Sequence, residues 1–239
     1  NAYDPRLKEH RLQKLVLNPN FHFHRLDICD RKALEILFEQ YNAQEEISAV
    51  INLAARAGVP VSVQNPWIYL ETNTLGTLNL LDLAQRYAVP KFVLASTSSL
   101  YGSQNPLPYN EDANTDHPLS PYAASKKGAE AMAYSYHHLY GLDVSIVRYF
   151  TVYGPAGRPD MSIFRFVHWI SQGIPIQLTG DGSQSRDFTY VDDIARGTCL
   201  ATKPLGFEII NLGSDRPYTL NEMIALIEKH TGNKAEIVF

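Results

Sequence analysis

The stretch "PLSPYAASKKGAE", residues 118–130, places Tyr122 four residues before Lys126. In an α-helix this spacing puts both side chains on one face, about one turn apart. Taken alone, the spacing fits a catalytic tyrosine with its lysine, and it equally fits an ordinary helix start with a surface aromatic residue. The elements on either side of this helix have to decide between the two interpretations.

Strand-like and helix-like segments alternate along the chain. Apolar runs predict strands over 21–28, 48–55, 91–97 and 143–150. Apolar periodicity and capping residues predict helices over 30–41, 68–87, 121–141 and 219–232. Asp30 is expected to cap the first of these, Gly141 to end the third, and Thr219 with Glu222 to form a capping box on the last. Apolar strands separated by helices indicate the α/β class, with a parallel sheet covered on both faces.

Polar or small residues gather where the predicted strands end. These positions are Asp27, Ala54–Ala55, Ser96–Ser99 and Tyr149–Thr151. Ligands of such sheets bind beyond the carboxyl ends of the strands, so the chemistry is expected there. After residue 154 prolines, glycines and short segments dominate. We therefore predict a sheet domain over 1–154 and a smaller region over 155–239, interleaved with the sheet domain.

Composition excludes several classes of function. The 239 residues carry a net charge of −4, which gives no basic field for a nucleic-acid partner. No apolar run approaches the roughly 18–20 residues of a membrane span, and we expect a soluble cytoplasmic protein. The two cysteines, Cys29 and Cys199, make neither a metal spacing nor a disulfide framework, so no metal site is predicted.

A tyrosine and lysine on one helix face can perform acid/base chemistry. The pKa of a free phenol is near 10, too high for a base at neutral pH. A nearby ammonium favours the phenolate and lowers this pKa, and an oxidised nicotinamide ring would lower it further. Tyr122 and Lys126 can thus form a general acid/base beside a hydride acceptor, and Thr97 is placed to share the proton of a substrate alcohol.

Five motifs, in order, resemble the extended short-chain dehydrogenase/reductase superfamily, in its branch of NAD-dependent epimerases and dehydratases. They are "NLAA" (52–55), "NTLGTLNLLDLA" (73–84), "LASTSSLYG" with "SPYAASK" (94–102 and 120–126), "RYFTVYGP" (148–155) and "RDFTYVDDIARG" (186–197). Each motif is weak alone, but their order is specific and favours the catalytic interpretation of Tyr122. The resemblance implies a Rossmann-like doubly wound sheet, NAD as cofactor, a UDP-sugar substrate and a homodimer formed by the helices around 68–87 and 121–140.

The resemblance also assigns residues to the site. It implies that Tyr122 takes the proton of the sugar 4-hydroxyl, that Lys126 binds the nicotinamide ribose and that Thr97 holds the 4-oxygen. An alternative for Asn73 is a helix-capping role. The cofactor-binding residues that the resemblance implies are Asp27, Ile28, Leu53, Ala54, Ala55, Asn73, Ser96, Tyr122, Lys126 and Tyr149.

Two stretches of sequence narrow the choice of substrate. The family's dehydratases and decarboxylases usually carry carboxylates where Ser98 and Ser99 stand, and "YFTVYGPAGRPDM" (149–161) resembles the UDP-glucuronate 4-epimerases. The resemblance thus implies conversion of UDP-glucuronate to UDP-galacturonate through a transient 4-keto intermediate. Ala156 stands where close relatives often have tryptophan, so epimerisation of UDP-glucose and UDP-galactose, or another dehydratase or reductase reaction of the superfamily, stays an alternative.

Hydroxyl donors and a guanidinium suit a substrate carboxylate. We expect Ser98, Ser99, Thr151 and Arg158 to bind the C6 carboxylate, beside Thr97 at the 4-oxygen. Arg186 is expected at the UDP diphosphate. The alternatives are that Arg158 only anchors its loop, and that Arg186 pairs with Asp187 or Asp192.

One family feature is missing from this sequence. No Gly-x-x-Gly-x-x-Gly loop, which would cradle the pyrophosphate, appears in it. The resemblance implies that the first βαβ unit, about 30–40 residues, is absent and that the carboxyl end stops short. NAD rather than NADP then follows by analogy only, and a truncated, non-catalytic nucleotide-binding remnant is an alternative of another class.

Overall fold

The computed structural model describes residues 3–44, 46–178 and 180–238. Contacts between Cα atoms divide the chain into two compact units. The sheet unit comprises Arg25–Phe150 and Asp193–Leu212, and the second unit comprises Asn1–His24, Thr151–Asp192 and Gly213–Phe239. The chain thus leaves the sheet unit near the predicted border at 154 and returns to it once. The binding roles that we assign to the two parts stay predictions.

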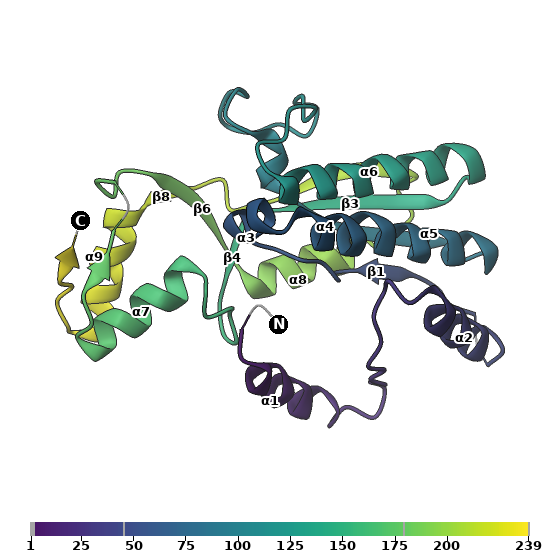
Figure 1. Ribbon diagram of the computed structural model, residues 1–239, viewed down its shortest axis with the longest axis horizontal. Coiled ribbons are helices and arrows are strands. Elements are labelled where there is room, and N and C mark those ends of the chain that lie inside the picture. Colours follow the sequence, from purple (N-terminus) through teal and green to yellow (C-terminus); the bar gives the residue numbers. More distant parts are fainter. Residues whose placement is uncertain (1–2, 45, 179, 239) are drawn as a thin grey trace. The chain divides into compact units, whose positions relative to one another are not determined.

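The sheet unit is built on four parallel strands in the order β1–β2–β3–β7, of which β1 and β3 are labelled in Figure 1. Their bounds are β1 Val50–Asn52, β2 Lys91–Thr97, β3 Asp143–Tyr149 and β7 Phe207–Leu212. All seven residues of β2 are buried, which explains the apolar run Phe92–Ala95 inside "KFVLAST". The predicted α/β class with a parallel sheet is confirmed, and β7 is a strand that the sequence analysis missed.

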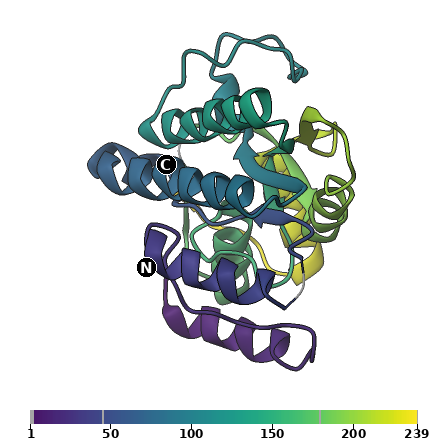
Figure 2. The same ribbon diagram turned by 90° about the vertical axis from the view of Figure 1, so that its right-hand side faces the viewer.

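Side-chain alternation along the strands distributes the core between two faces. Phe92, Leu94 and Ile146 pack on one face beneath α2 Arg31–Asn42, α5 Gly76–Arg86 and α6 Pro121–Tyr140. These helices lie in a row, coloured indigo, blue and teal in Figure 2. Val93 and Val147 point the other way, toward Ala201 at the end of α8 Val191–Leu200. The same alternation determines which polar side chains at the strand ends can contact one another.

The helix ends follow the predicted capping chemistry. Ser120 Oγ accepts from Ala123 N at 3.2 Å, and Gly141 ends α6 with φ 69°. Only glycine adopts this left-handed conformation without a steric penalty, which explains the residue type. Asp30 caps α2, and the capping box of Thr219 and Glu222 opens α9 Leu220–Thr231. These predictions are confirmed.

The predicted helix over 68–87 has an unexpected interior. It consists of α4 Pro66–Tyr69, a π-helical turn η1 Leu70–Leu75, and α5, with α3 Val59–Gln64 before it. A π-helical turn inserts an extra residue into the helical repeat, and such turns often occur at functional sites. Apolar periodicity could not show it, because the apolar face continues on both sides.

The predicted strand over 21–28 is wrong. The segment has no regular secondary structure, and no other segment of the described chain pairs with it. A strand needs a neighbour for its backbone groups, and β1, at the edge of the sheet, pairs only with β2. The predicted strand over 48–55 is also shorter than expected, since pairing covers only β1.

The second unit has a small sheet and its own core. Its strands β4 Thr151–Tyr153, β6 Ser185–Tyr190 and β8 Pro217–Thr219 run in the order β4–β6–β8. Its other elements are α1 Pro5–Leu15, α7 Ser162–Gln172, β5 Ile176–Gln177, α9 and β9 Ile237–Val238. Phe166, Ile170 and Ile224 are buried in its core. In the parts of the chain that the structure describes, no helix has the length and apolar character needed to cross a membrane, and no group of side chains is arranged for a metal ion.

Candidate active site

The predicted pair lies in the first two turns of α6. Tyr122 is half-buried, and its ring meets that of Tyr69 edge-on, with centroids 6.2 Å apart and an interplanar angle of 76°. Tyr69 in turn donates from its hydroxyl to the carbonyls of Ala57 and Gly58. The edge-on contact fixes the plane of the Tyr122 ring against the loop that follows β1.

Lys126 is 2% exposed, yet its ammonium has no acceptor among the residues that the structure describes. Burial lowers its pKa to about 8, and the nearby carboxylate of Glu130 partly offsets this by favouring the charged form. A buried ammonium with unused donors is costly unless a polar ligand completes its hydrogen bonds. The hydroxyls of a ribose are acceptors of the kind that would complete these hydrogen bonds, and the role of Lys126 toward a cofactor stays a prediction.

Thr97 ends β2 and begins the next turn. Its Oγ1 accepts from Ser99 N at 3.2 Å and lies 3.2 Å from Ser99 Oγ, so Thr97 caps the short 3₁₀ helix η2 Ser98–Tyr101. The structure thus brings the three predicted residues Thr97, Ser98 and Ser99 together in a single turn. This turn lies at the carboxyl end of β2, where the strand pattern predicts the chemistry.

Ser96 and Tyr149 turn their hydroxyls toward opposite faces of the sheet. Ser96 Oγ donates to Glu130 Oε1 at 2.5 Å on the α6 side. The Tyr149 hydroxyl lies 2.7 Å from Thr198 Oγ1 on the α8 side, and burial raises the pKa of this phenol. Both hydroxyls already bind neighbouring helices, and the roles of these residues toward a cofactor stay predictions.

The loop after β1 is exposed, and the buried side chain of Asn73 binds its backbone. Leu53, Ala54 and Ala55 are exposed, and their small or flat surface leaves room for a ligand. Asn73 is fully buried in η1; its Oδ1 accepts from Arg56 N at 2.7 Å and its Nδ2 donates to Arg56 O at 3.0 Å. Asn73 therefore shapes this loop, and it does not act as a helix cap.

The "NTLGTLN" motif holds a second loop in the same way. Asn79 Nδ2 donates to Ile28 O at 3.0 Å, and a Cβ on Gly76 would lie 2.6 Å from Ile28 Cδ1, which explains the glycine. Asp27 Oδ1 accepts from Cys29 N at 2.9 Å in the same turn. One helical segment, 73–79, thus positions both predicted cofactor loops, and sequence reasoning missed this role.

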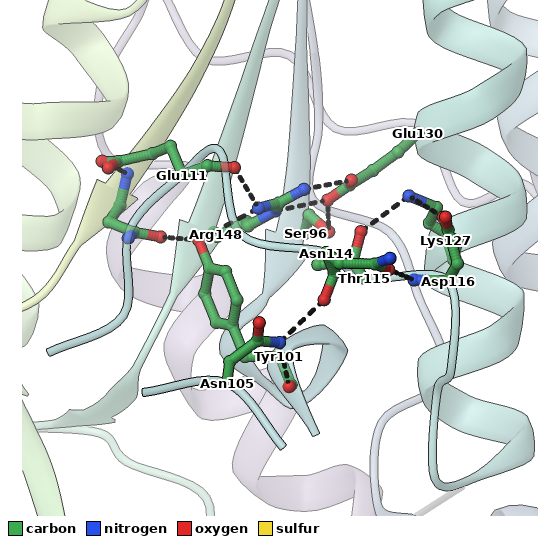
Figure 3. A network of polar contacts seen from close by, with 11 residues as sticks. Ser96, Tyr101, Asn105, Glu111, Asn114, Thr115, Asp116, Lys127, Glu130 and Arg148 are labelled. Atoms are coloured by element: carbon green, nitrogen blue, oxygen red, sulfur yellow. Dashed lines mark hydrogen bonds and ion pairs between the residues drawn. The ribbon is translucent and has the colours of Figure 1, made fainter. Parts of the chain in front are cut away.

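A buried polar network lies one helical turn beyond Lys126 (Figure 3). Glu130 receives both Nε and Nη2 of Arg148, at 3.1 and 2.8 Å, and these residues are 5% and 2% exposed. Arg148 Nη1 donates to the Tyr101 hydroxyl at 3.0 Å and to Glu111 O at 3.1 Å. Burial opposes the charge of Arg148, but its bonds to Glu130 outweigh burial and raise its pKa. The sequence did offer one signal of this network: Arg148 is a single arginine within the largely apolar strand β3.

The remaining predicted substrate residues lie in the second unit. Thr151 and Arg158 both line a cavity of about 420 Å³ formed by residues of 151–158 and of α7. Arg158 also binds both oxygens of Asp160, at 3.0 and 2.5 Å, which is the loop-anchoring contact of the alternative interpretation.

Arg186, also in the second unit, donates to Ser185 O at 2.7 Å. Within the described residues it forms no ion pair with Asp187 or Asp192, because the Asp187 carboxylate accepts from Ser214 N instead. The alternative pairing for Arg186 is therefore not observed.

A parallel sheet with a helix that presents Tyr122 and a buried Lys126 at its carboxyl edge defines a Rossmann-like enzyme. The family model of the NAD dependent epimerase/dehydratase family matches residues 3–213. The UDP-glucuronate 4-epimerase of Thermodesulfobacterium geofontis is 58% identical over 237 residues, which cover 99% of this chain and 72% of that protein. The chain belongs to the NAD-dependent epimerase/dehydratase family.

Solved structures agree with this assignment. A UDP-glucuronic acid 4-epimerase from Bacillus cereus, in complex with UDP-glucuronic acid and NAD, matches with a TM-score of 0.91 and 35% identity, covering 100% of this chain and 74% of that one. A UDP-glucose 4-epimerase from Thermotoga maritima with UDP-glucose matches with a TM-score of 0.86 and 29% identity, covering 97% and 82%. The predicted family, Rossmann-like fold and NAD-dependent epimerase class are confirmed.

Proposed function

We propose that this protein catalyses the NAD-dependent 4-epimerisation of UDP-glucuronate to UDP-galacturonate through a transient 4-keto sugar. The observation that carries the proposal is the buried Lys126 ammonium, without an acceptor of its own, one helical turn from Tyr122. The similarity to UDP-glucuronate 4-epimerases supports the choice of reaction.

The residues present fit a dinucleotide. Lys126 offers donors for ribose hydroxyls, the exposed loop Leu53–Ala55 offers a wall of small surface, and Asp27 with Ile28 forms a second loop for the adenine end. NAD, when bound, accepts a hydride from the sugar C4 and returns it to the opposite face. The cofactor is regenerated in each turnover, so tight binding is expected.

The acid/base work falls to Tyr122. Its phenolate takes the proton from the 4-hydroxyl while the hydride leaves C4, and its phenol returns the proton after the sugar has turned its other face. Lys126, with a pKa of about 8, is mostly charged at neutral pH and holds the phenolate form. Thr97 Oγ1 orients the 4-oxygen. The 4-keto sugar rotates about its phosphate linkage between the two half-reactions.

Within the second unit, the carboxylate specificity is assigned to the Thr151 hydroxyl and the Arg158 guanidinium. Within the sheet unit, the hydroxyls of Ser98 and Ser99 are assigned to substrate binding. Thr151 and Arg158 line one cavity, which supports a shared ligand. Arg158 keeps Asp160 as a partner, so the substrate carboxylate is expected to share or replace that carboxylate. Arg186 is assigned to the diphosphate, because no carboxylate of the described chain pairs with it. A cytoplasmic homodimer completes the proposal.

The experiment is epimerisation of UDP-glucuronate and, separately, of UDP-glucose, followed by the sugar proton signals in NMR spectra. We expect UDP-galacturonate from the first substrate and a slower reaction, or none, with the second. Rapid interconversion of UDP-glucose and UDP-galactose would favour the second candidate, a neutral-sugar 4-epimerase. Ala156 and the likeness to the Thermotoga maritima UDP-glucose 4-epimerase favour that candidate.

Arg158→Ala tests the carboxylate assignment. Losing the guanidinium should raise KM for UDP-glucuronate by about 10–100-fold, because a charged hydrogen bond contributes about 1.5–3 kcal/mol, while KM for UDP-glucose changes little. The control is Arg165→Ala: this arginine stacks on Trp169 and does not line the cavity. Equal losses for both substrates would leave Arg158 as a loop anchor only.

A further inference from the structure

The Glu130–Arg148 network joins three elements of the sheet unit, α6, β2 and β3. Glu130 comes from α6, one turn beyond Lys126. Ser96 comes from β2, next to Thr97, and Arg148 comes from β3. The carboxylate of Glu130 is saturated by them, because Oε1 accepts from Ser96 Oγ and Arg148 Nε while Oε2 accepts from Arg148 Nη2. One buried side chain thus fastens the catalytic helix to two strand ends at once.

The same network fastens the loop that runs from β2 to the catalytic helix. Arg148 Nη1 holds the Glu111 carbonyl, and the Glu111 carboxylate accepts from Asn211 N of β7 at 2.8 Å. Tyr101, in η2, donates to Asn211 Oδ1 at 2.7 Å. From α6 itself, Lys127 Nζ donates to Thr115 Oγ1 of this loop at 2.6 Å, and Figure 3 shows this contact together with the Glu130–Arg148 pair.

We propose that Glu130 and Arg148 are positioning residues of the epimerase reaction, which set the axial position and rotation of α6 and thereby place Tyr122 and Lys126 against Thr97. The inference rests on the proposed function for its catalytic consequence. Neither residue is assigned a contact with the reacting atoms.

Geometry supports a positioning role over a purely stabilising one. The guanidinium uses both Nε and Nη2 on a single carboxylate, a paired contact that fixes direction as well as distance. Lys126 and Glu130 are four residues apart, so a rotation of α6 that displaces one displaces the other. Displacement of a reacting group by about 1 Å can cost about 10²-fold in rate.

Glu130→Gln is the first test, because the amide keeps the shape and loses the charge that binds Arg148. We expect kcat to fall by about 10²-fold while KM for UDP-glucuronate changes by less than about threefold, since the substrate-binding side chains stay in place. Ser96→Ala, which removes one hydrogen bond, should give a smaller fall in kcat of the same kind. If Glu130→Gln fails to fold, the kinetic test uses Ser96→Ala and the double variant Glu130→Gln/Arg148→Gln. The double variant buries no unpaired charge.

The matched control is Asp143→Asn, at the opposite end of β2 and β3, where Lys91 and Asp143 form the other buried ion pair of these strands. It should leave kcat per folded molecule within about twofold of wild type. An equal fall in kcat for the two buried-pair variants would overturn the proposal, as would unchanged kcat in both Ser96→Ala and the double variant.

Hydrogen exchange gives a readout that does not need turnover. In Glu130→Gln the amides of the first turn of α6 and of residues 103–118 should exchange about tenfold faster, while Asp143→Asn leaves them unchanged. If wild-type protein epimerises no UDP-sugar, the proposed function fails, and this exchange pattern still decides whether the network holds the helix. Unchanged exchange of these amides in Glu130→Gln would contradict the positioning role.

Discussion

Two ion pairs lie at opposite ends of β2 and β3, one fully buried and one with a partly exposed aspartate, and they differ in what surrounds them. At the amino ends, Lys91 pairs with Asp143 and donates to Ser145 Oγ at 2.8 Å, and the backbone amides of Leu205 and Gly206 complete the Asp143 carboxylate. At the carboxyl ends, the Glu130–Arg148 pair lies one turn from Lys126, whose ammonium has no acceptor among the described residues.

The difference shows where this fold tolerates unsatisfied charge. Breaking a buried pair is costly because it leaves an uncompensated charge, so both pairs are completed by further hydrogen bonds. Lys126 is the exception, and burial lowers its pKa to about 8. Because groups with perturbed pKa values cluster at functional sites, the contrast supports the proposal that the reaction takes place at the carboxyl edge.

The largest expected effect comes from Tyr122→Phe, which removes the proposed proton carrier. We expect kcat for UDP-glucuronate to fall by about 10²–10⁴-fold, the usual contribution of a general acid/base. Tyr134→Phe is the control, because this tyrosine lies on the same helix and is 53% exposed. NMR assays of both variants would decide the matter: epimerisation at the wild-type rate by Tyr122→Phe would remove the basis of the mechanism.

A smaller effect is expected at the amino ends of the strands. Asp143→Asn should lower the free energy of unfolding by about 3 kcal/mol, because Lys91 stays buried without its charged partner. Its bonds to Lys91 and to the Gly206 amide outweigh burial and lower the pKa of Asp143, so its stabilisation is present at neutral pH and is lost as the pH falls through that lowered pKa. Urea unfolding at pH 7 and pH 3 measures both; equal stability of variant and wild type at pH 7 would contradict it.

The smallest effect concerns Lys126, for which stability also rises with pH, but in an alkaline range. Its pKa is about 8 in the folded protein and about 10.4 in an unfolded chain, so the unfolded state binds more protons between these values and stability rises with pH. Between pH 7.5 and 9.5 the free energy of unfolding should gain about 2 kcal/mol from this group. Lys126→Met should abolish that gain, and a gain of the same size in the variant would assign it to another group.

Much of the sheet unit was predictable because its local signals agree with its packing. β2 has an apolar centre, Phe92–Ala95, and is buried on both faces, α6 has a proline at its start and a glycine after its end, and α2 and α9 carry cap residues that the structure uses. The segment 21–28 has an equally good strand pattern, yet it finds no pairing partner in the described chain. Propensity describes a segment, whereas a strand also requires a neighbour.

The candidate site likewise has features that local sequence predicts and features that depend on packing. Spacing alone placed Tyr122 and Lys126 on one helix face, because a helix repeats every 3.6 residues whatever surrounds it. The partners of Ser96, Arg148 and Tyr149 depended on which face of the sheet each side chain occupies, and on which helix covers that face.

By itself, the order of residues determined the class of fold, the family and the helix that carries Tyr122 and Lys126, since these rest on periodicity and on motifs that are local in the chain. Only the tertiary structure decided that Lys126 is buried without an acceptor, that Asn73 clamps the loop at Arg56, and that Glu130 binds Arg148 eighteen residues away. The physical reason is that burial and hydrogen-bond partners belong to the packed surfaces between elements, and those surfaces exist only once distant segments have come together.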